Sequence, residues 1–223
     1  MSGLPTRAAY RLWAPQYDAE TALSHLESET VARFDVVTRR RSLLDVGCGT
    51  ARRLRDTDAA TAVGVDLTFE MLAHARDEHP VAAADVRALP FCDGSFDLVW
   101  CRLVLGHVPD PDDAYAELAR VCRKNGSVVV SDVAVEAVNA GHKRTFRDAG
   151  GSTHEVEHFV HDADTHIAAA RHAGLEIEQR LNGVVGPSIE SYYVRARRER
   201  AYEQQRGLPL ILGLLFRKRA VDP

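Results

Sequence analysis

Short apolar runs rich in valine, leucine and alanine alternate with helix-like stretches through the middle of this chain. The five runs are, in order, RSLLDVG, TAVGVDL, VAAADV, FDLVWCRLV and GSVVVSDV, and together they span residues 41–133. Between them, apolar positions recur at helical spacing over Phe69–Glu78 and Asp112–Cys122. Because the strand-like runs are nearly continuous in apolar residues, they indicate a parallel sheet covered on both faces.

The C-terminal third continues the pattern with one more helix and two more strands. A helix is expected over Asp164–His172, a strand in AGLEIEQRL (173–181) and a last strand in LPLILGLLFRKR (208–219). The charged segment YYVRARRERAYEQQRG between these strands is interpreted as a helical arm with a solvated face. No repeat or long linker divides the chain, so the pattern predicts a single doubly wound α/β domain, residues 1–223, that begins with a helical segment.

Composition narrows the possible partners. The 223 residues carry a formal net charge of −4, so no overall basic field attracts nucleic acid or an anionic membrane. No apolar run approaches the roughly 18 residues of a membrane span, and the first residues lack the apolar core of a secretory signal. The cysteines show no CxxC spacing, which is typical of reduced thiols. We therefore expect a cytoplasmic protein, monomeric or homodimeric, that acts on a small molecule.

A glycine turn follows the first strand, in LLDVGCGTARRL. Gly47 and Gly49 flank one residue where a strand leads into a helix-like stretch, and such a turn lies at the carboxyl edge of the sheet, where open α/β sheets bind ligands. The same pattern occurs in nicotinamide and flavin enzymes, and a turn without any ligand is also possible. The turn alone therefore leaves open whether a phosphate or a nucleoside lies against it.

Three acidic residues favour a nucleoside without phosphate. Asp66 ends the second strand, about 20 positions after Asp45, where a carboxylate can accept hydrogen bonds from both ribose hydroxyls. Asp85 ends the third strand and is placed to accept from an exocyclic amine such as that of adenine. Asp45 stands beside the turn itself, where it would repel a pyrophosphate but suit an ammonium group. This set favours S-adenosylmethionine (SAM) over a dinucleotide.

The motifs LLDVGCGTARRL, VGVDLTFEMLAHAR, ADVRALPFCDGSFDLVWC and ELARVCRKNGSVVVSD together resemble those of class I SAM-dependent methyltransferases. The resemblance is to the small-molecule branch that includes ubiquinone and menaquinone methyltransferases, and it runs from about Tyr10 to Asp132. It implies a Rossmann-like seven-stranded sheet of order 3-2-1-4-5-7-6 with the seventh strand antiparallel. It also implies a helical cap (1–40), a SAM-binding half (41–135), a substrate lid (136–163) and the last two strands with their helical arm (164–223). Ala51 departs from the pattern, since it stands where a third glycine is usual.

The resemblance also assigns roles to cofactor-binding residues. Asp45, Gly47, Cys48 and Gly49 would line the methionine part of SAM, and Asp66 would hold its ribose. The remaining expected contacts are Leu67 and Met71 with the adenine ring, Asp85 and Val86 with its polar edge, the Cys101 backbone with the methionyl end, and Tyr17 as a closing residue. The product would be S-adenosylhomocysteine (SAH).

Two residues are candidates for proton transfer during methylation. Positioning supplies much of the rate of methyl transfer, and a base is needed only for a weakly acidic nucleophile. His107 follows the fourth strand and could accept a proton near neutral pH, although it could equally bond to local backbone. Asp132 ends the fifth strand and is a second candidate, or it caps the segment that follows.

The sequence indicates the residues that would contact the methyl acceptor less specifically than those that would bind the cofactor. Tyr10 and Trp13 are expected either to pack in the core of the cap or to form a platform for the acceptor. His142, His154 and His158 lie in a histidine-rich segment that we interpret as a substrate lid, with solvated histidines or a metal site as alternatives; we expect no metal.

The overall interpretation is a methyltransferase that acts on an oxygen, nitrogen or carbon atom of a small metabolite. The alternatives are a SAM-binding protein with a non-methylating activity and a nicotinamide-dependent oxidoreductase.

Overall fold

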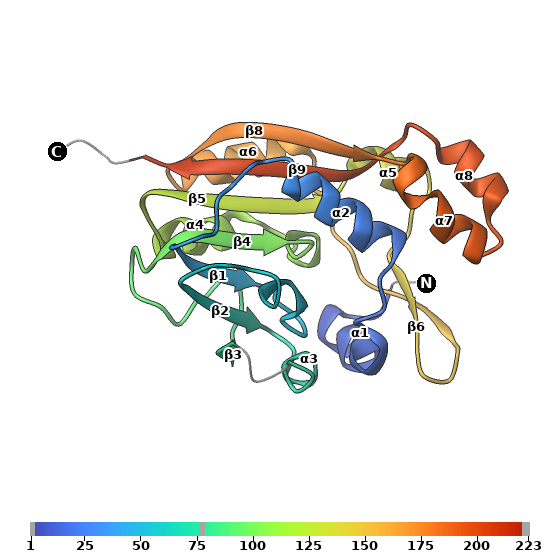
Figure 1. Cartoon of the computed structure of the whole chain (residues 1–223), viewed down its shortest axis with the longest axis horizontal. Coiled ribbons are helices and arrows are strands. Elements are labelled where there is room, and N and C mark those ends of the chain that lie inside the picture. Colours follow the sequence, from blue (N-terminus) through green and yellow to red (C-terminus); the bar gives the residue numbers. More distant parts are fainter. Residues whose placement is uncertain (1–2, 76–78, 220–223) are drawn as a thin grey trace.

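Seven strands pair into one sheet of order β3-β2-β1-β4-β5-β9-β8 in the computed structural model, which describes residues 3–75 and 79–219. β9 runs antiparallel to both of its neighbours, and the other pairs are parallel. The predicted fold class, sheet order and antiparallel strand are therefore confirmed (Figure 1). The strands of this sheet are β1 (Ser42–Val46), β2 (Thr61–Asp66), β3 (Val81–Ala83), β4 (Phe96–Arg102), β5 (Cys122–Val133), β8 (Leu175–Val184) and β9 (Pro209–Lys218).

Helices cover both faces of the sheet and the edge at which the parallel strands end. The helices are α1 (Thr6–Trp13), α2 (Ala22–Ala32), α3 (Phe69–Leu72), α4 (Asp112–Val121), α5 (Val135–Asn139), α6 (Ala163–His172), α7 (Pro187–Arg195) and α8 (Glu199–Gln205), with 3-10 turns η1 (Ala14–Gln16), η2 (Arg52–Leu54) and η3 (Leu105–His107). α4 and α6 pack together behind the sheet, and α2 crosses its front over β8 and β9 (Figure 1). α1 and α3 lie beyond the ends of β1 and β2.

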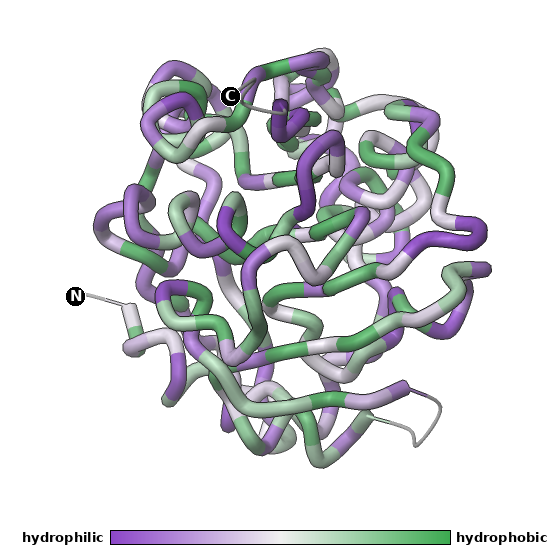
Figure 2. The backbone as a smooth tube through the Cα atoms, turned by 90° about the vertical axis from the view of Figure 1, so that its left-hand side faces the viewer, coloured by the Kyte–Doolittle hydropathy of each residue, from purple (hydrophilic) through white to green (hydrophobic). Residues whose placement is uncertain are grey.

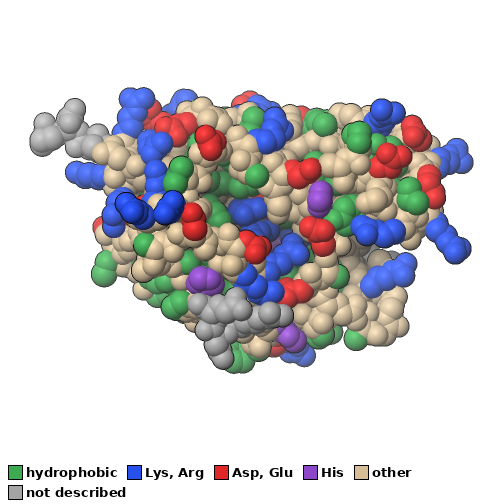
Figure 3. Space-filling model, in the orientation of Figure 1, with side chains coloured by type: hydrophobic (Ala, Val, Ile, Leu, Met, Phe, Trp, Pro, Cys, Tyr) green, Lys and Arg blue, Asp and Glu red, His purple; other side chains and the backbone are tan. Residues whose placement is uncertain are grey.

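The core follows from strands that are buried on both faces. All but the first residue of β1 are buried, and so are the last eight residues of β5, as expected for central parallel strands. Figure 2 shows hydrophobic stretches along the strands that cross the interior, with most hydrophilic segments at the periphery. Basic and acidic side chains are interspersed over the face shown in Figure 3. No helix in the described parts of the chain has the length and apolar character needed to cross a membrane.

The expected cap divides into two parts. α1 lies over the carboxyl edge of the sheet, whereas α2 packs on the sheet face because its buried side chains Leu26, Glu27 and Thr30 point toward β5, β8 and β9. A capping box at Thr21 and Ser24 begins α2.

The expected lid contains a small hairpin that the sequence did not predict. β6 (Thr145–Arg147) pairs antiparallel with β7 (Thr153–Glu155), and the N-terminal Leu4 pairs with Val156 just beyond the hairpin. The helix predicted over Phe69–Glu78 ends at Leu72 in α3, and residues 76–78 of that prediction lie outside the described residues. The hairpin and α1 thus stand together over the carboxyl edge of the sheet.

Candidate active site

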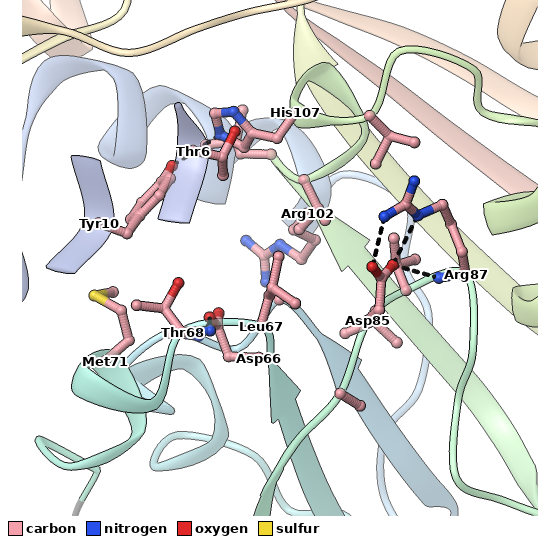
Figure 4. A pocket seen from close by; sticks show the side chains of 18 of the residues that line it. Thr6, Tyr10, Asp66, Leu67, Thr68, Met71, Asp85, Arg87, Arg102 and His107 are labelled. Atoms are coloured by element: carbon pink, nitrogen blue, oxygen red, sulfur yellow. Dashed lines mark hydrogen bonds and ion pairs between the residues drawn. The ribbon is translucent and has the colours of Figure 1, made fainter. Parts of the chain in front are cut away.

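A cavity opens at the carboxyl edge, between α1 and the ends of β1, β2, β3 and β4. It holds about 810 Å³ of empty space, part of it open to solvent. Figure 4 shows Tyr10 and His107 on one side of it, Asp66, Thr68 and Met71 below, and Asp85 with Arg87 opposite. Its lining residues are Thr6, Tyr10, Tyr17, Val46, Gly47, Gly49, Asp66, Leu67, Thr68, Met71, Ala84, Asp85, Val86, Arg87, Arg102, Leu103, Val104, His107, Val108 and Pro109.

The glycine turn forms one wall of the cavity. Gly47 and Gly49 have φ of 72° and 59°, a left-handed conformation that glycine adopts without steric cost. A Cβ on Gly47 would lie 2.2 Å from Cγ2 of Val104, so the close neighbour here is a side chain of the protein itself. Ala51, at the position of the usual third glycine, also has a left-handed φ of 57°.

Asp66 joins the glycine turn to the end of β2. Its Oδ2 accepts a hydrogen bond from the Gly49 backbone N–H at 2.9 Å, and its Oδ1 accepts one from the Thr68 N–H at 2.8 Å. Burial raises the pKa of this carboxyl above its ordinary value. Each carboxylate oxygen has a further lone pair, so Asp66 can accept two more hydrogen bonds from a ligand in the cavity.

Asp85 reaches the opposite side of the cavity, where it is paired with a residue that the sequence analysis missed. The Arg87 guanidinium donates to both of its oxygens, at 3.0 and 2.7 Å. The hydrogen bonds from Arg87 lower the pKa of Asp85, which keeps the carboxylate charged. Val86 between them is buried and lines the same wall.

Asp45 lies just behind the lining residue Val46 and is fully buried. Both of its oxygens lack a hydrogen-bond partner among the described residues. Burial raises the pKa of this carboxyl to about 6, although the positive charges of Arg53 and Arg102 oppose the rise. A buried carboxylate without a donor is costly, and a ligand ammonium group would relieve the cost.

Three predicted cofactor residues are not among those that line the cavity: Asp45, described above, and two cysteines. The Cys48 thiol points into the core beneath Gly64, where a Cβ would lie 2.7 Å from Sγ. Cys101 is fully buried in the main hydrophobic core, and the cavity is lined instead by Arg102, Leu103 and Val104, which follow it. Any contact of Cys48 or Cys101 with a ligand would therefore be made by backbone.

A chain of hydrogen bonds fixes the His107 side chain at the edge of the cavity. Its Nδ1 lies 3.3 Å from the carbonyl oxygen of Glu157, which can only accept, so Nδ1 carries the proton. Nε2 then accepts from the Tyr10 hydroxyl at 2.9 Å, and that hydroxyl accepts from Nη2 of Arg144 at 2.6 Å. Burial and the nearby charge of Arg144 lower the pKa of His107 to about 3. His107 is thus a neutral, weak base whose lone pair is occupied.

Trp13 packs in the cap and does not line this cavity. Its ring stacks between Tyr10 and Phe146 of the hairpin, with centroids at 5.6 and 5.0 Å. Tyr17, in contrast, lines the cavity next to Gly49, where the resemblance places it. Of the expected acceptor platform, Tyr10 therefore faces the cavity and Trp13 supports it from behind.

The predicted acid and lid histidines do not converge on the cavity. Asp132 is buried behind it, with His158 Nε2 at 3.6 Å from Oδ1 and His166 Nε2 at 3.7 Å from Oδ2. His154 bonds to Asp148 on the hairpin at 2.7 Å, and His142 lines a separate hollow. In residues 3–75 and 79–219, no group of three or more His, Cys, Asp or Glu side chains has an arrangement that could hold a metal ion.

Comparison with known proteins identifies the family. The family model "Methyltransferase domain" matches residues 44–130. A phosphatidylethanolamine N-methyltransferase of Cereibacter sphaeroides is 39% identical over 132 residues, which are 55% of this chain and 64% of that protein. A ubiquinone biosynthesis O-methyltransferase of Thiobacillus denitrificans is 31% identical over 174 residues, 70% of this chain and 73% of that protein. The chain belongs to the class I SAM-dependent methyltransferases.

Other relatives of this chain differ in their named acceptors. A malonyl-[acyl-carrier protein] O-methyltransferase of Erwinia billingiae is 31% identical over 56% of this chain and 52% of its own. The chain spans between about half and two thirds of the length of the first curated relatives that it matches. A SAM-dependent methyltransferase structure from Mesorhizobium loti has a TM-score of 0.66 at 22% identity, covering 86% of this chain and 97% of that one, and shows the shared fold.

The cavity residues fit the cofactor of this family. Asp66 offers free acceptor positions at the cavity, and the buried Asp45 carboxylate has no hydrogen-bond donor among the described residues. The sequence analysis missed Arg87 and Thr68, although both stand within two residues of a predicted contact. It also missed Arg102 and Arg144, for which no local motif gives a signal.

Proposed function

We propose that this protein transfers the methyl group of SAM to an oxygen, nitrogen or carbon atom of a small metabolite. The observation that carries the proposal is the Asp66 carboxylate, which the backbone N–H groups of Gly49 and Thr68 hold at the cavity with further acceptor positions open. The family membership supports this proposal and disfavours a nicotinamide-dependent oxidoreductase.

Each part of the cofactor has a matching group in the cavity. Asp66 would accept from the ribose hydroxyls, and Asp85 with the Val86 backbone would meet the polar edge of adenine. Leu67 and Met71 would pack on the ring, since both line the cavity and Met71 is buried. The Asp45 carboxylate, buried and without a hydrogen-bond partner among the described residues, would pair with the ammonium group of SAM.

Bound SAM supplies an electrophilic methyl carbon, so the protein's own contribution is to orient the acceptor and to exclude water. The geometry favours a positioning role for His107, because its lone pair accepts from Tyr10 and its pKa is about 3. A base with so low a pKa removes a proton poorly near neutral pH. The catalytic assignments of His107 and Asp132 remain predictions, and transfer is expected to depend chiefly on alignment.

The acceptor is proposed to be a small metabolite and not a nucleic acid, given the net charge of −4. A second candidate function is a reaction on the same fold without methyl transfer. The structure of a [4+2]-cyclase covers 98% of this chain with a TM-score of 0.66 at 20% identity, and this likeness concerns the fold alone.

The test is an incubation of the protein with SAM labelled in its methyl group and a panel of phenols, amines and carboxylic acids. We expect SAH to form in proportion to a labelled product, and we expect Asp66→Asn to abolish both at the same SAM concentration. SAM that binds tightly but stays intact while a panel compound is converted would contradict methyl transfer and support the second candidate.

A further inference from the structure

Arg144 is a buried cation without a counter-charge. It follows α5 and precedes β6, its side chain is 7% exposed, and no carboxylate in the described residues lies within ion-pair distance of its guanidinium. Its one hydrogen bond goes from Nη2 to the Tyr10 hydroxyl at 2.6 Å. Nε and Nη1 are buried and have no hydrogen-bond partner within residues 3–75 and 79–219. The one donor on Nε and the two on Nη1 are therefore unused.

An unpaired buried guanidinium is costly, and native proteins usually pair such a charge. The contrast with Arg102 illustrates this, because Arg102 is equally buried but donates to both oxygens of Glu27 at 2.8 Å. The backbone of Arg144 is held in place, since its carbonyl accepts from the Val156 N–H at 2.9 Å next to the hairpin. The unused donors thus belong to a fixed element and not to an exposed loop.

Arg144 is one of the residues that line a second hollow, distinct from the cofactor cavity. This hollow lies between α1, the start of α2, residues 141–145 and the α7–α8 arm, and holds about 1400 Å³ of empty space, part of it open to solvent. Lys143, Arg144 and Arg198 line it, and none of its described lining residues is acidic. Trp13 and Tyr193 add aromatic surface. The hollow therefore combines positive charge with aromatic walls.

Tyr10 connects the two spaces. Its hydroxyl accepts from Arg144, a lining residue of the second hollow, and donates to His107, which lines the cofactor cavity together with Tyr10. Figure 4 shows the Tyr10 hydroxyl pointing toward His107 at the edge of the cavity. A group bound at Arg144 would thus lie one side chain away from the wall of the cofactor site.

We propose that Arg144 binds an oxyanion of the methyl acceptor, a carboxylate or a phosphate, in this second hollow. The planar guanidinium is suited to such groups because it can donate two parallel hydrogen bonds to them. The ion pair would hold the anionic end of an aromatic or acyl acceptor while its nucleophile reaches past Tyr10 to the cofactor cavity. This inference rests on the proposed function and names the class of acceptor.

The test uses the full chain saturated with SAH and three probes: benzoate, phenyl phosphate and the neutral benzamide. NMR titration should show benzoate or phenyl phosphate binding about tenfold or more tightly than benzamide, since charged hydrogen bonds are strong. Arg144→Gln should erase this preference, Arg144→Lys should keep only part of it, and the exposed Arg147→Gln on β6 should leave it intact. The two anions distinguish a carboxylate site from a phosphate site.

Two outcomes would overturn the inference. One is equal binding of the three probes, or a preference that survives in Arg144→Gln. The other is a loss of SAH affinity in Arg144→Gln with unchanged affinity for methylthioadenosine, which would assign Arg144 to the carboxylate of SAM itself. Failure of SAH to bind the wild-type protein would instead refute the proposed function, so the two failures are distinguishable.

Discussion

The buried ion pair behind the cofactor cavity gives a quantitative prediction for Glu27→Gln. Glu27 on α2 is fully buried, and Arg102, which lines the cavity, donates to both of its oxygens at 2.8 Å. Ser131 also donates to it at 2.7 Å, and Arg53 lies 3.6 Å away. A neutral glutamine would leave two arginines without this counter-charge.

Two independent arguments give a similar loss of unfolding free energy for Glu27→Gln. Burial alone would raise the pKa of Glu27, but Arg102 and Arg53 outweigh it and lower the pKa to about 2 from an ordinary 4.5. That shift corresponds to about 3 kcal/mol of stability. Removal of one partner from a buried pair independently costs about 3–5 kcal/mol. For a chain of this size, about 3 kcal/mol is a fall in Tm of roughly 6–12 °C.

The assay is urea unfolding followed by circular dichroism at pH 7 and at lower pH. Because the folded pKa lies below the unfolded one, the contribution is complete above about pH 4.5 and is lost as the pH falls toward 2. The difference between wild type and Glu27→Gln should shrink over that window. Glu29→Gln, on the exposed side of the same helix, is the matched control and should change stability by less than about 0.5 kcal/mol. A Glu27→Gln protein as stable as wild type at pH 7 would refute the reasoning.

Three further predictions concern the cavity itself. Asp66→Asn should weaken SAM binding by about 1.5–3 kcal/mol in a calorimetric titration. Asp113→Asn, at the exposed start of α4, is the control and should leave the SAM affinity unchanged. Equal SAM affinities of Asp66→Asn and the wild type would contradict the assignment of Asp66 to the ribose. Between about pH 6.5 and 3 the unfolded chain binds a proton at His107 that the folded chain does not, so the unfolding free energy should fall by up to about 1.4 kcal/mol for each unit that the pH is lowered. His107→Gln should flatten this pH dependence, and an unchanged slope would contradict the buried neutral state. Gly47→Ala should lower the unfolding free energy by at least about 1–2 kcal/mol through its left-handed φ, and Val104→Ala should restore the part that comes from the 2.2 Å clash; a double mutant no better than Gly47→Ala would remove the clash from the account.

The sheet was predictable because central parallel strands are buried on both faces and so carry dense apolar runs. β1, β2, β4 and β5 fall where those runs predict them. The hairpin of β6 and β7 was not predictable, since each strand has only three residues. Its two strands also carry charged and polar residues, which give no alternating pattern.

Site residues were predictable where they stand at the end of a strand or within two residues after it. Gly47, Asp66 and Asp85 all line the cavity, because the ends of parallel strands meet at one edge of the sheet. Cys48 and Cys101 stand at the same positions along the chain, but their side chains turn into the core, which spacing alone does not reveal.

Contacts between distant parts of the chain gave no sequence signal. Tyr10 and His107 are 97 positions apart, and Arg144 is 134 positions from Tyr10. Their hydrogen-bond chain depends on how the cap and the hairpin meet over the sheet. The same contact changes the interpretation of His107, from a free base to a neutral side chain fixed by Tyr10.

The most direct test of the central claim is a parallel calorimetric titration of the protein with SAM, SAH and NADH. The account predicts that SAM and SAH bind, that NADH does not, and that Asp66→Asn weakens the first two together. Binding of NADH without SAM or SAH would contradict it, because a cavity lined by Asp66 and Asp85, with Asp45 buried next to it, would then have to hold a pyrophosphate.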